Sequence, residues 1–237
     1  MRIFAEPRPR RPETCALAVF AKAPIPGTVK TRLIPPLTSE EAARLHAALV
    51  EDTLCRTAAL DMVRYLACTP DIRHPFLQAC AQRYGARLIA QGAGDLGDRM
   101  LRVVKTLLAR HGKVLLVGTD SPTLPLEFVA EAEDRLNAAD LVFGPSEDGG
   151  YYLLGQRRLY PEIFRGVAWG GADVLRATLA KLDPSRVRLL PPWYDVDRPE
   201  DLARLRHDLA ESVGCERTTA WFRGWRQPSR PQKLLRL

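Results

Sequence analysis

The stretch CALAVFAKAPIPGTVKTRL, from Cys15 to Leu33, joins an apolar run to a loop rich in proline and cations. The run Cys15–Ala21 has the length and composition of a buried strand. Pro24 and Pro26 stiffen the following loop, so it loses little entropy on closing over a ligand, and Gly27 lets a ligand approach the backbone. The spacing is not that of a Walker A loop, in which glycine, lysine and serine or threonine are contiguous.

Three cations of this loop can converge on a strongly anionic ligand, for which phosphate is the obvious guest. The predicted phosphate- or nucleotide-binding residues here are Lys22, Gly27, Lys30, Thr31 and Arg32. A rigid turn with solvated lysines is the alternative interpretation of the same pattern.

Outward from this stretch, strand-like and helix-like segments alternate with short connections. The predicted strands are 15–21, 62–68, 87–90, 113–117, 141–143, 151–154 and 187–190. The predicted helices are 39–59, 75–84, 98–110, 126–137, 173–182 and 199–211, and Ser39 is the expected N-cap of the first. This alternation indicates an α/β fold: a three-layer α/β/α sandwich with a mostly parallel, Rossmann-like sheet. We expect a single domain over residues 14–215, between a disordered basic leader (1–13) and a basic aromatic tail (216–237).

The formal net charge of +7 belongs to the two ends of the chain. Residues 1–13 hold four arginines against two glutamates, residues 216–237 hold six cations against one glutamate, and the body between them is neutral. Trp221, Phe222 and Trp225 give the tail the mixture of aromatics and cations found in some RNA-binding segments. Docking of the tail on its own domain, or on a second copy in a homodimer, is favoured because exposed aromatics are costly. Nucleic acid is therefore not the expected partner.

The five cysteines are odd in number and never spaced as Cys-x-x-Cys, which favours reduced thiols and a cytoplasmic location. No apolar run approaches the roughly 18 residues that cross a bilayer, so no membrane partner is expected. The arginine-containing N-terminus lacks the apolar segment of a secretory signal.

Acidic residues follow several of the predicted strands, at the sheet edge where open α/β folds bind their ligands. Asp120 ends the most apolar strand, where a carboxylate is costly unless it is paired or binds a metal. Asp195 and Asp197 alternate along an extended segment, so only one is expected to face the site, and Asp197 with Glu200 is preferred. Together with phosphate oxygens, Asp120, Asp197 and Glu200 could hold Mg²⁺ or Mn²⁺. The alternatives are that Asp120 caps a turn and Asp197 caps a helix.

Three glycine-containing segments complete the candidate site. Asp148-Gly149-Gly150 is either a tight hairpin turn or a place where backbone amides and Asp148 meet a substrate. A glycine-rich loop with Gly94, Leu96 and Gly97 precedes a helix and suits a nucleotide. Trp169 and Gly170 precede another helix and could hold an anionic acceptor. The four histidines show no metal-ligand spacing and are interpreted as surface or packing residues.

Four motifs in order resemble a widespread bacterial transferase family described as glycosyltransferase-like, related to 2-phospholactate guanylyltransferase and the molybdenum-cofactor nucleotidyltransferases. The motifs are Lys22-x7-Lys30-Thr31-Arg32-Leu33, Gly118-Thr119-Asp120-Ser121-Pro122, Asp148-Gly149-Gly150-Tyr151-Tyr152 and Asp195-Val196-Asp197-Arg198-Pro199-Glu200-Asp201-Leu202. The resemblance covers about residues 15 to 210.

This resemblance implies a GT-A fold of the nucleotide-diphospho-sugar transferase type. It also implies a divalent metal at Asp120, joined by Asp197 and Glu200, and contact between Lys30 and phosphate. Arg198 stands where threonine is common in the family. Ser121 and Pro122 follow Asp120, so the Asp-x-Asp signature of many glycosyltransferases is missing at this position, and this favours nucleotidyl transfer.

The predicted function is a Mg²⁺-dependent transferase that acts on a nucleoside triphosphate or nucleotide sugar. Lys30, Asp120 and Asp148 are the expected catalytic residues, and nucleotidyl transfer with release of pyrophosphate is preferred. The unknown small-molecule acceptor is expected near Asp148, Gly149, Gly150, Trp169 and Gly170. One alternative is sugar transfer, and another is a non-catalytic module that binds through its tail.

Overall fold

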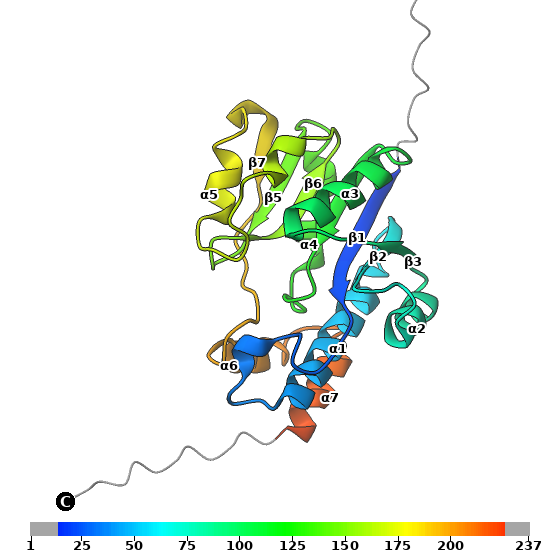
Figure 1. The fold of residues 1–237 in the computed structure, drawn as a ribbon, viewed down its shortest axis with the longest axis vertical. Coiled ribbons are helices and arrows are strands. Elements are labelled where there is room, and N and C mark those ends of the chain that lie inside the picture. Colours follow the sequence, from blue (N-terminus) through cyan, green and yellow to red (C-terminus); the bar gives the residue numbers. More distant parts are fainter. Residues whose placement is uncertain (1–13, 226–237) are drawn as a thin grey trace, which may run out of the picture.

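The computed structural model describes residues 14–225, and the expectations for the leader and for residues 226–237 fall outside this range. A seven-stranded sheet with strand order β3-β2-β1-β4-β6-β5-β7 forms the centre of the molecule (Figure 1). Its strands are β1 (Cys15–Lys22), β2 (Val63–Thr69), β3 (Arg87–Ala90), β4 (Lys113–Val117), β5 (Leu141–Pro145), β6 (Tyr151–Gln156) and β7 (Val187–Leu189). Only β6 runs antiparallel to its neighbours, β4 and β5, so the sheet is mostly parallel as predicted.

Strand β1 shows why the sheet lies at the centre. Leu17 and Val19 belong to the apolar cluster on one face, whereas Ala16 and Ala18 belong to the cluster on the other. Because successive side chains of a strand point to opposite faces, the apolar run from Cys15 to Ala21 must be covered on both sides.

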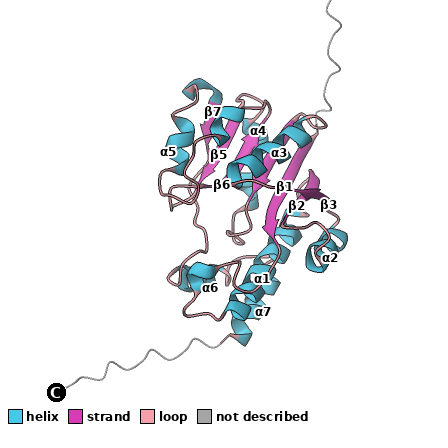
Figure 2. Ribbon diagram, viewed as in Figure 1, coloured by secondary structure: helices cyan, strands magenta, loops and turns pink. Residues whose placement is uncertain are grey.

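Helices cover both faces of the sheet, which confirms the predicted α/β/α layers (Figure 2). One face packs against α1 (Ser39–Thr57), α2 (Pro75–Tyr84) and α4 (Leu126–Arg135). The other packs against α3 (Leu96–Leu108), the 3₁₀ turn η2 (Pro161–Phe164) and α5 (Val174–Leu179). Two more 3₁₀ turns are η1 (Thr31–Leu33) and η3 (Pro184–Arg186).

A third apolar cluster lies beyond the carboxyl end of β1, where α1 meets α6 (Asp201–Asp208) and α7 (Glu216–Gly224) (Figure 1). Leu45 and Leu49 of α1, Leu205 of α6 and Phe222 of α7 are buried in it. The indole N–H of Trp221 donates to the carbonyl of Glu41, at 3.2 Å. The first part of the aromatic tail therefore docks on the chain's own α1.

The carboxylate of Asp52, which is 1% exposed on α1, fixes the start of α7. It accepts hydrogen bonds from the backbone N–H groups of Arg217 (3.0 Å) and Thr218 (2.7 Å). These are donors that an isolated helix leaves without partners.

We expect Asp52→Ala to lower the free energy of unfolding by about 1–2 kcal/mol, the usual cost of losing a helix N-cap. Chemical denaturation followed by tryptophan fluorescence measures this loss, since Trp221 and Trp225 lie at α7. Asp52→Asn keeps one acceptor oxygen and is expected to lose less. Equal stability of wild type and Asp52→Ala would show that α7 does not depend on this cap.

Several predicted helix boundaries were wrong. Thr38, not Ser39, is the N-cap of α1, and it forms a capping box with Glu41. Helix α3 begins two residues earlier than predicted because Asp95 forms a capping box with Asp98.

Within residues 14–225, no helix is long and apolar enough to span a bilayer.

Candidate active site

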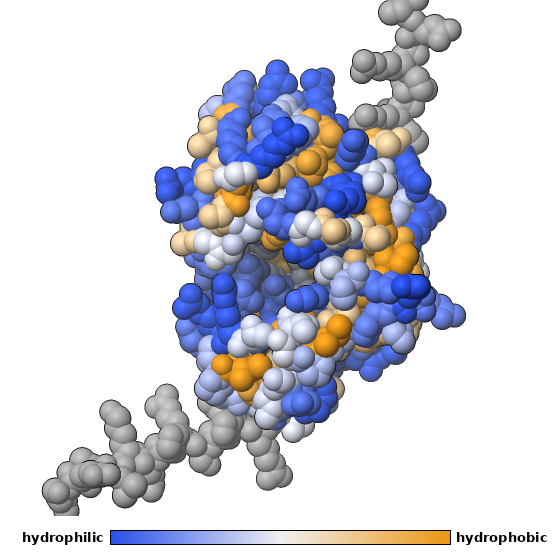
Figure 3. All heavy atoms as spheres, in the orientation of Figure 1, coloured by the Kyte–Doolittle hydropathy of each residue, from blue (hydrophilic) through white to orange (hydrophobic). Residues whose placement is uncertain are grey.

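A cavity of about 430 Å³ opens at the carboxyl ends of the central strands. Its walls come from the loop after β1, the loop after β4, the β5–β6 turn, the start of α3 and the segment before α6. Figure 3 shows the hollow between the sheet and the α6 side of the molecule, with a mostly hydrophilic rim. The cavity lies at the same sheet edge where the sequence predicts a ligand site.

The ammonium group of Lys30 lies between two carboxylates at the floor of this cavity. Its Nζ is 2.5 Å from Oδ1 of Asp120 and 3.0 Å from Oδ1 of Asp197. It also donates to the backbone carbonyl of Val196, at 2.6 Å. The three ammonium hydrogens therefore have three acceptors. Two of these acceptors, Val196 and Asp197, are 166 and 167 residues away from Lys30 in the sequence.

Burial and charge together decide the ionisation of this group. The Lys30 side chain is 3% exposed, while those of Asp120 and Asp197 are 41% and 34% exposed. Burial alone would lower the pKa of Lys30, but the charges of Asp120 and Asp197 outweigh it and raise that pKa. Burial likewise opposes ionisation of Asp120, and the Lys30 charge overcomes it to lower the pKa of Asp120. Lys30 and Asp120 are therefore both charged at neutral pH.

Asp195 also lines the cavity, and the prediction that only one of Asp195 and Asp197 would face the site was wrong. The segment between β7 and α6 is not a regular strand, so side chains need not alternate between two sides. Asp195 accepts from the hydroxyl of Ser121 at 2.5 Å. Burial, with the nearby charges of Asp120 and Asp148, raises the pKa of Asp195 to about 7.

Asp148 lies in the β5–β6 turn and, like Lys22 at the end of β1, lines the cavity. Its Oδ1 accepts from the N–H of Gly150 at 3.0 Å and from the hydroxyl of Ser146. The segment is a tight turn, and this turn places Asp148 and Gly150 on the cavity wall. Gly149 does not line the cavity: it has φ +92°, and an added Cβ would collide with the carbonyl of Ala172.

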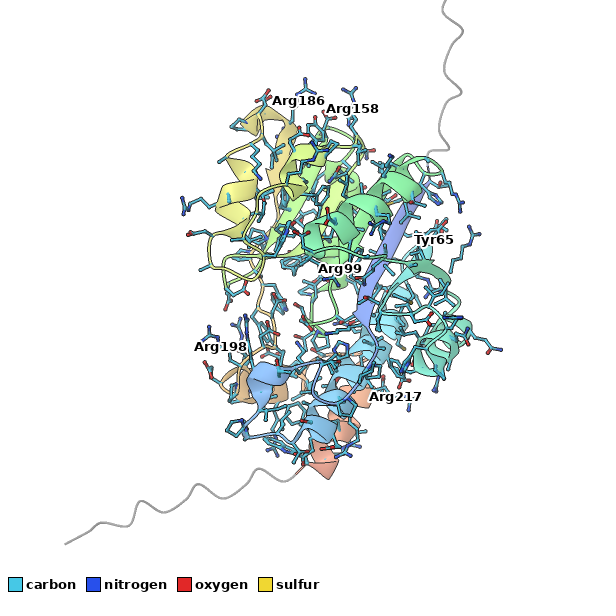
Figure 4. All side chains as sticks on the ribbon, in the orientation of Figure 1. Tyr65, Arg99, Arg158, Arg186, Arg198 and Arg217 are labelled. Atoms are coloured by element: carbon cyan, nitrogen blue, oxygen red, sulfur yellow. The ribbon has the colours of Figure 1, made fainter. Side chains whose placement is uncertain are left out.

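One wall of the cavity is apolar and aromatic. Leu96 and Met100 come from α3, Tyr151 from β6 and Trp169 from the segment before α5. The rings of Tyr151 and Trp169 pack edge to face, with their centroids 6.5 Å apart. Arg99 lies on the same part of α3, near the middle of the view in Figure 4. Gly170 also lines this side.

Two functional candidates were missed in the sequence. His46, expected to be a surface or packing residue, lies on the cavity wall and is 5% exposed. Its Nε2 is 2.9 Å from the carbonyl of Lys22, so Nε2 carries the proton, and burial lowers the pKa of His46. Gln91 is 3% exposed at the end of β3 and also lines the cavity. The strand-end rule that selected Asp120 could have found Gln91, but no spacing signal marks His46.

Several predicted nucleotide-binding residues do not line the cavity. Gly97 instead packs beneath Phe164 and Trp169, where an added Cβ would collide with them. The Arg32 side chain is 57% exposed, with Nη1 3.7 Å from Oδ2 of Asp197. The other three predicted nucleotide-binding residues that do not line the cavity are Gly27, Thr31 and Gly94.

Glu200 is not brought to the carboxylates that meet Lys30. It is exposed at the N-cap position of α6 and does not line the cavity. Asp201, rather than Asp197, accepts from the N–H groups that precede α6, those of Asp197 (2.9 Å) and Arg198 (2.6 Å). Asp197 therefore does not cap this helix. Figure 4 shows Arg198 on the α6 side of the molecule.

The fold is that of the nucleotidyltransferases and nucleotide-diphospho-sugar transferases, the GT-A-like class that the motifs predicted. The chain belongs to the bacterial family DUF2064, described as "uncharacterized protein conserved in bacteria", whose model matches residues 53–171. No curated protein matches the chain significantly in sequence.

Solved structures support this assignment. A protein from Desulfovibrio desulfuricans G20, provisionally described as a nucleotide-diphospho-sugar transferase, is 33% identical with a TM-score of 0.77; the match covers 90% of this chain and 98% of that one. The 4-diphosphocytidyl-2C-methyl-D-erythritol synthase of Anaerococcus prevotii is 12% identical (TM-score 0.59; 84% and 96% covered). A nucleotidyl transferase from Methanothermobacter thermautotrophicus is 16% identical (TM-score 0.56; 84% and 99% covered). The last two show the fold alone.

Proposed function

We propose that the protein is a Mg²⁺-dependent transferase that uses a nucleoside triphosphate or nucleotide sugar, and that it transfers a nucleotidyl group with release of pyrophosphate. The observation that carries the proposal is the meeting of Lys30 with Asp120 and Asp197 inside the cavity. The similarity to the Desulfovibrio protein, provisionally described as a nucleotide-diphospho-sugar transferase, over 98% of that protein supports the use of a nucleotide substrate.

The chemistry of the carboxylates fits a divalent cation. Asp120 and Asp197 already share one cation, the Lys30 ammonium, and both keep exposed surface toward the cavity. Mg²⁺ prefers one or two carboxylates completed by phosphate oxygens and water. Within residues 14–225, no group of three histidine, cysteine or acidic side chains is placed so that it could hold a metal. Mg²⁺ held there would neutralise phosphate charge as it develops.

The residues of the chain would act by positioning and by charge. Lys22 and Lys30 would hold the phosphates, and Lys30 would exchange one of its present acceptors, such as the Val196 carbonyl, for a phosphate oxygen. The acceptor molecule would lie between Asp148 and the wall formed by Trp169. Holding the acceptor in line with the reacting phosphate, beside charges that are already in place, would supply the rate without a covalent enzyme intermediate.

A thermal-shift panel of nucleoside triphosphates and nucleotide sugars, each with and without Mg²⁺, tests the proposal. A ligand at one hundred times its Kd stabilises the fold by about 2.7 kcal/mol, or roughly 5–10 °C for a domain of this size. We expect such a rise for at least one nucleotide, and only with Mg²⁺ present. A panel in which no nucleotide raises the melting temperature contradicts the proposal.

Sugar transfer is the second candidate, and the description of the Desulfovibrio relative favours it. In that reaction Asp148 would accept the proton of an acceptor hydroxyl. The released product separates the two reactions: pyrophosphate indicates nucleotidyl transfer, whereas a nucleoside diphosphate indicates sugar transfer.

A further inference from the structure

Two segments that are far apart in the sequence, 120–123 in the loop after β4 and 194–197 before α6, are joined by three hydrogen bonds. The bonded pairs are Asp120 with Val196 (carbonyl and N–H, 2.8 Å), Ser121 with Asp195 (hydroxyl and carboxylate, 2.5 Å) and Thr123 with Tyr194 (two hydroxyls, 3.0 Å). The numbers rise along one segment and fall along the other, so the two segments run antiparallel. Because one segment carries Asp120 and the other Asp197, these bonds set the separation of the two carboxylates that meet Lys30.

The third of these bonds lies outside the cavity. Thr123 and Tyr194 are 4% and 3% exposed, and neither residue lines the cavity. Thr123 lies three residues after Asp120, and Tyr194 lies three residues before Asp197. Since neither side chain faces the cavity, any effect of this bond on the site must pass through the positions of the two segments.

Tyr194 is a fixed point for this bond. The preceding residue, Trp193, is tied to the sheet: its N–H donates to the carbonyl of Pro145 at 3.0 Å, and its carbonyl accepts from the N–H of Glu147 at 2.9 Å. The guanidinium group of Arg204 lies over the Tyr194 ring, 3.9 Å from the ring centroid. Packing therefore holds the ring in place, and the hydroxyl group passes that position on to the loop after β4.

Two buried hydroxyls carry a cost that filling space does not require. Each hydroxyl loses its water on burial, whereas an apolar pair of similar shape would pack without that loss. Burial, together with the nearby carboxylate of Asp208, raises the pKa of Tyr194 well above its ordinary range, so the hydroxyl stays protonated at neutral pH. Thr123 and Tyr194 therefore keep a directional contact in a place where packing alone would not specify one.

We infer that Thr123 and Tyr194 are positioning residues, and that their hydrogen bond holds Asp120 and Asp197 at the separation at which both reach one cation, as they reach the Lys30 ammonium group. The inference rests on the proposed function, in which that cation is Mg²⁺. Without the bond, one end of the antiparallel pair of segments is held by packing alone, and the two carboxylates can move apart. A displacement of about 1 Å, caused from outside the chemistry, can cost on the order of 10²-fold in rate.

Thr123→Val tests the inference because it removes the bond and keeps the shape of the side chain. We expect it to weaken Mn²⁺ binding by at least about tenfold, in the presence of the nucleotide that gives the largest thermal shift, and to lower kcat by a similar factor. Electron paramagnetic resonance of free Mn²⁺ measures the first effect, and turnover of the same nucleotide measures the second. Thr123→Ser keeps the hydroxyl and is expected to behave like the wild type in both measurements.

Tyr65→Phe is the matched control. It also removes a buried hydroxyl with a 3.0 Å hydrogen bond, here to Nε2 of His111. Tyr65 lies on β2 and does not line the cavity (Figure 4). We expect Tyr65→Phe to lower the melting temperature and to leave Mn²⁺ binding and kcat unchanged.

Tyr194→Phe keeps the packed ring and decides the question if Thr123→Val does not fold. The double variant is expected to lose about as much Mn²⁺ affinity as the larger single loss, because both exchanges break the same bond. Wild-type Mn²⁺ affinity in Thr123→Val or Tyr194→Phe, equal losses in Thr123→Val and Thr123→Ser, or single losses that add in the double variant overturn the inference and leave the proposed function standing. If the wild type binds no Mn²⁺ with any nucleotide, both are overturned.

Discussion

Asp120→Asn is expected to keep the fold and to lose at least about one hundredfold in kcat/KM. The exchange preserves the shape of the side chain but removes the charge that faces Lys30 at 2.5 Å and, in the proposed function, Mg²⁺. Loss of a single preorganised charge contact in an active site costs on the order of 10²–10³ in rate. The measurement is pyrophosphate release with the nucleotide that gives the largest thermal shift, together with the circular-dichroism melting curve.

The retained fold in this prediction follows from the other partners of Lys30. Asp197 and the Val196 carbonyl remain, so the buried ammonium keeps two acceptors. Asp134→Asn on α4, an exposed aspartate outside the cavity, is the control and is expected to leave kcat/KM unchanged. Activity of Asp120→Asn within a few-fold of the wild type would contradict the catalytic role of Asp120.

The convergence of Lys30, Asp120, Asp148 and Asp197 could be predicted because two simple rules govern it. Alternating strand and helix patterns predict a parallel sheet, and the carboxyl ends of its strands share one edge. Any polar residue that directly follows such a strand then falls near that edge, however distant it is in sequence. Asp120 after β4 and Lys22 at the end of β1 follow from these rules.

The residues that were missed depend on packing, which these rules do not include. His46 lies within α1, and it reaches the Lys22 carbonyl only because that helix crosses the end of β1. Asp195 and Asp197 share the cavity because their segment departs from regular strand geometry. Glu200 was chosen from its spacing in the family motif, whereas the structure leaves it exposed. The two capping boxes were overlooked because their N-cap residues precede the predicted helix starts. Thr38 lies one residue before the first predicted helix, and Asp95 lies three residues before the third.

Asp140 supports a prediction about stability rather than activity. Its side chain is 4% exposed just before β5 and ties three segments together. Oδ1 accepts from Nε of Arg157 at 2.8 Å, and Oδ2 accepts from Nη1 of Arg186 (2.8 Å) and the hydroxyl of Tyr160 (2.7 Å). Burial opposes ionisation, but these hydrogen bonds outweigh it and hold the pKa of Asp140 well below its ordinary range.

We expect Asp140→Ala to lower the free energy of unfolding at pH 7 by about 2–3 kcal/mol. Removing one member of a buried pair costs about 3–5 kcal/mol when the remaining charge is trapped, and less here because Arg157 and Arg186 are 37% and 48% exposed and can be hydrated again. Urea denaturation measures the loss, with Asp61→Ala at an exposed turn as the control.

The pH dependence of this loss tests its electrostatic origin. Because the pKa of Asp140 is lower in the folded state than in the unfolded chain, the unfolded chain takes up the proton first as the pH falls. The contribution of Asp140 is therefore complete above the unfolded pKa of about 4 and is lost as the pH falls toward the folded value. The difference between wild type and Asp140→Ala should shrink between pH 5 and about pH 3. A difference that stays constant over this range would mean that Asp140 stabilises the β5–β6–β7 edge by packing and not by its charge.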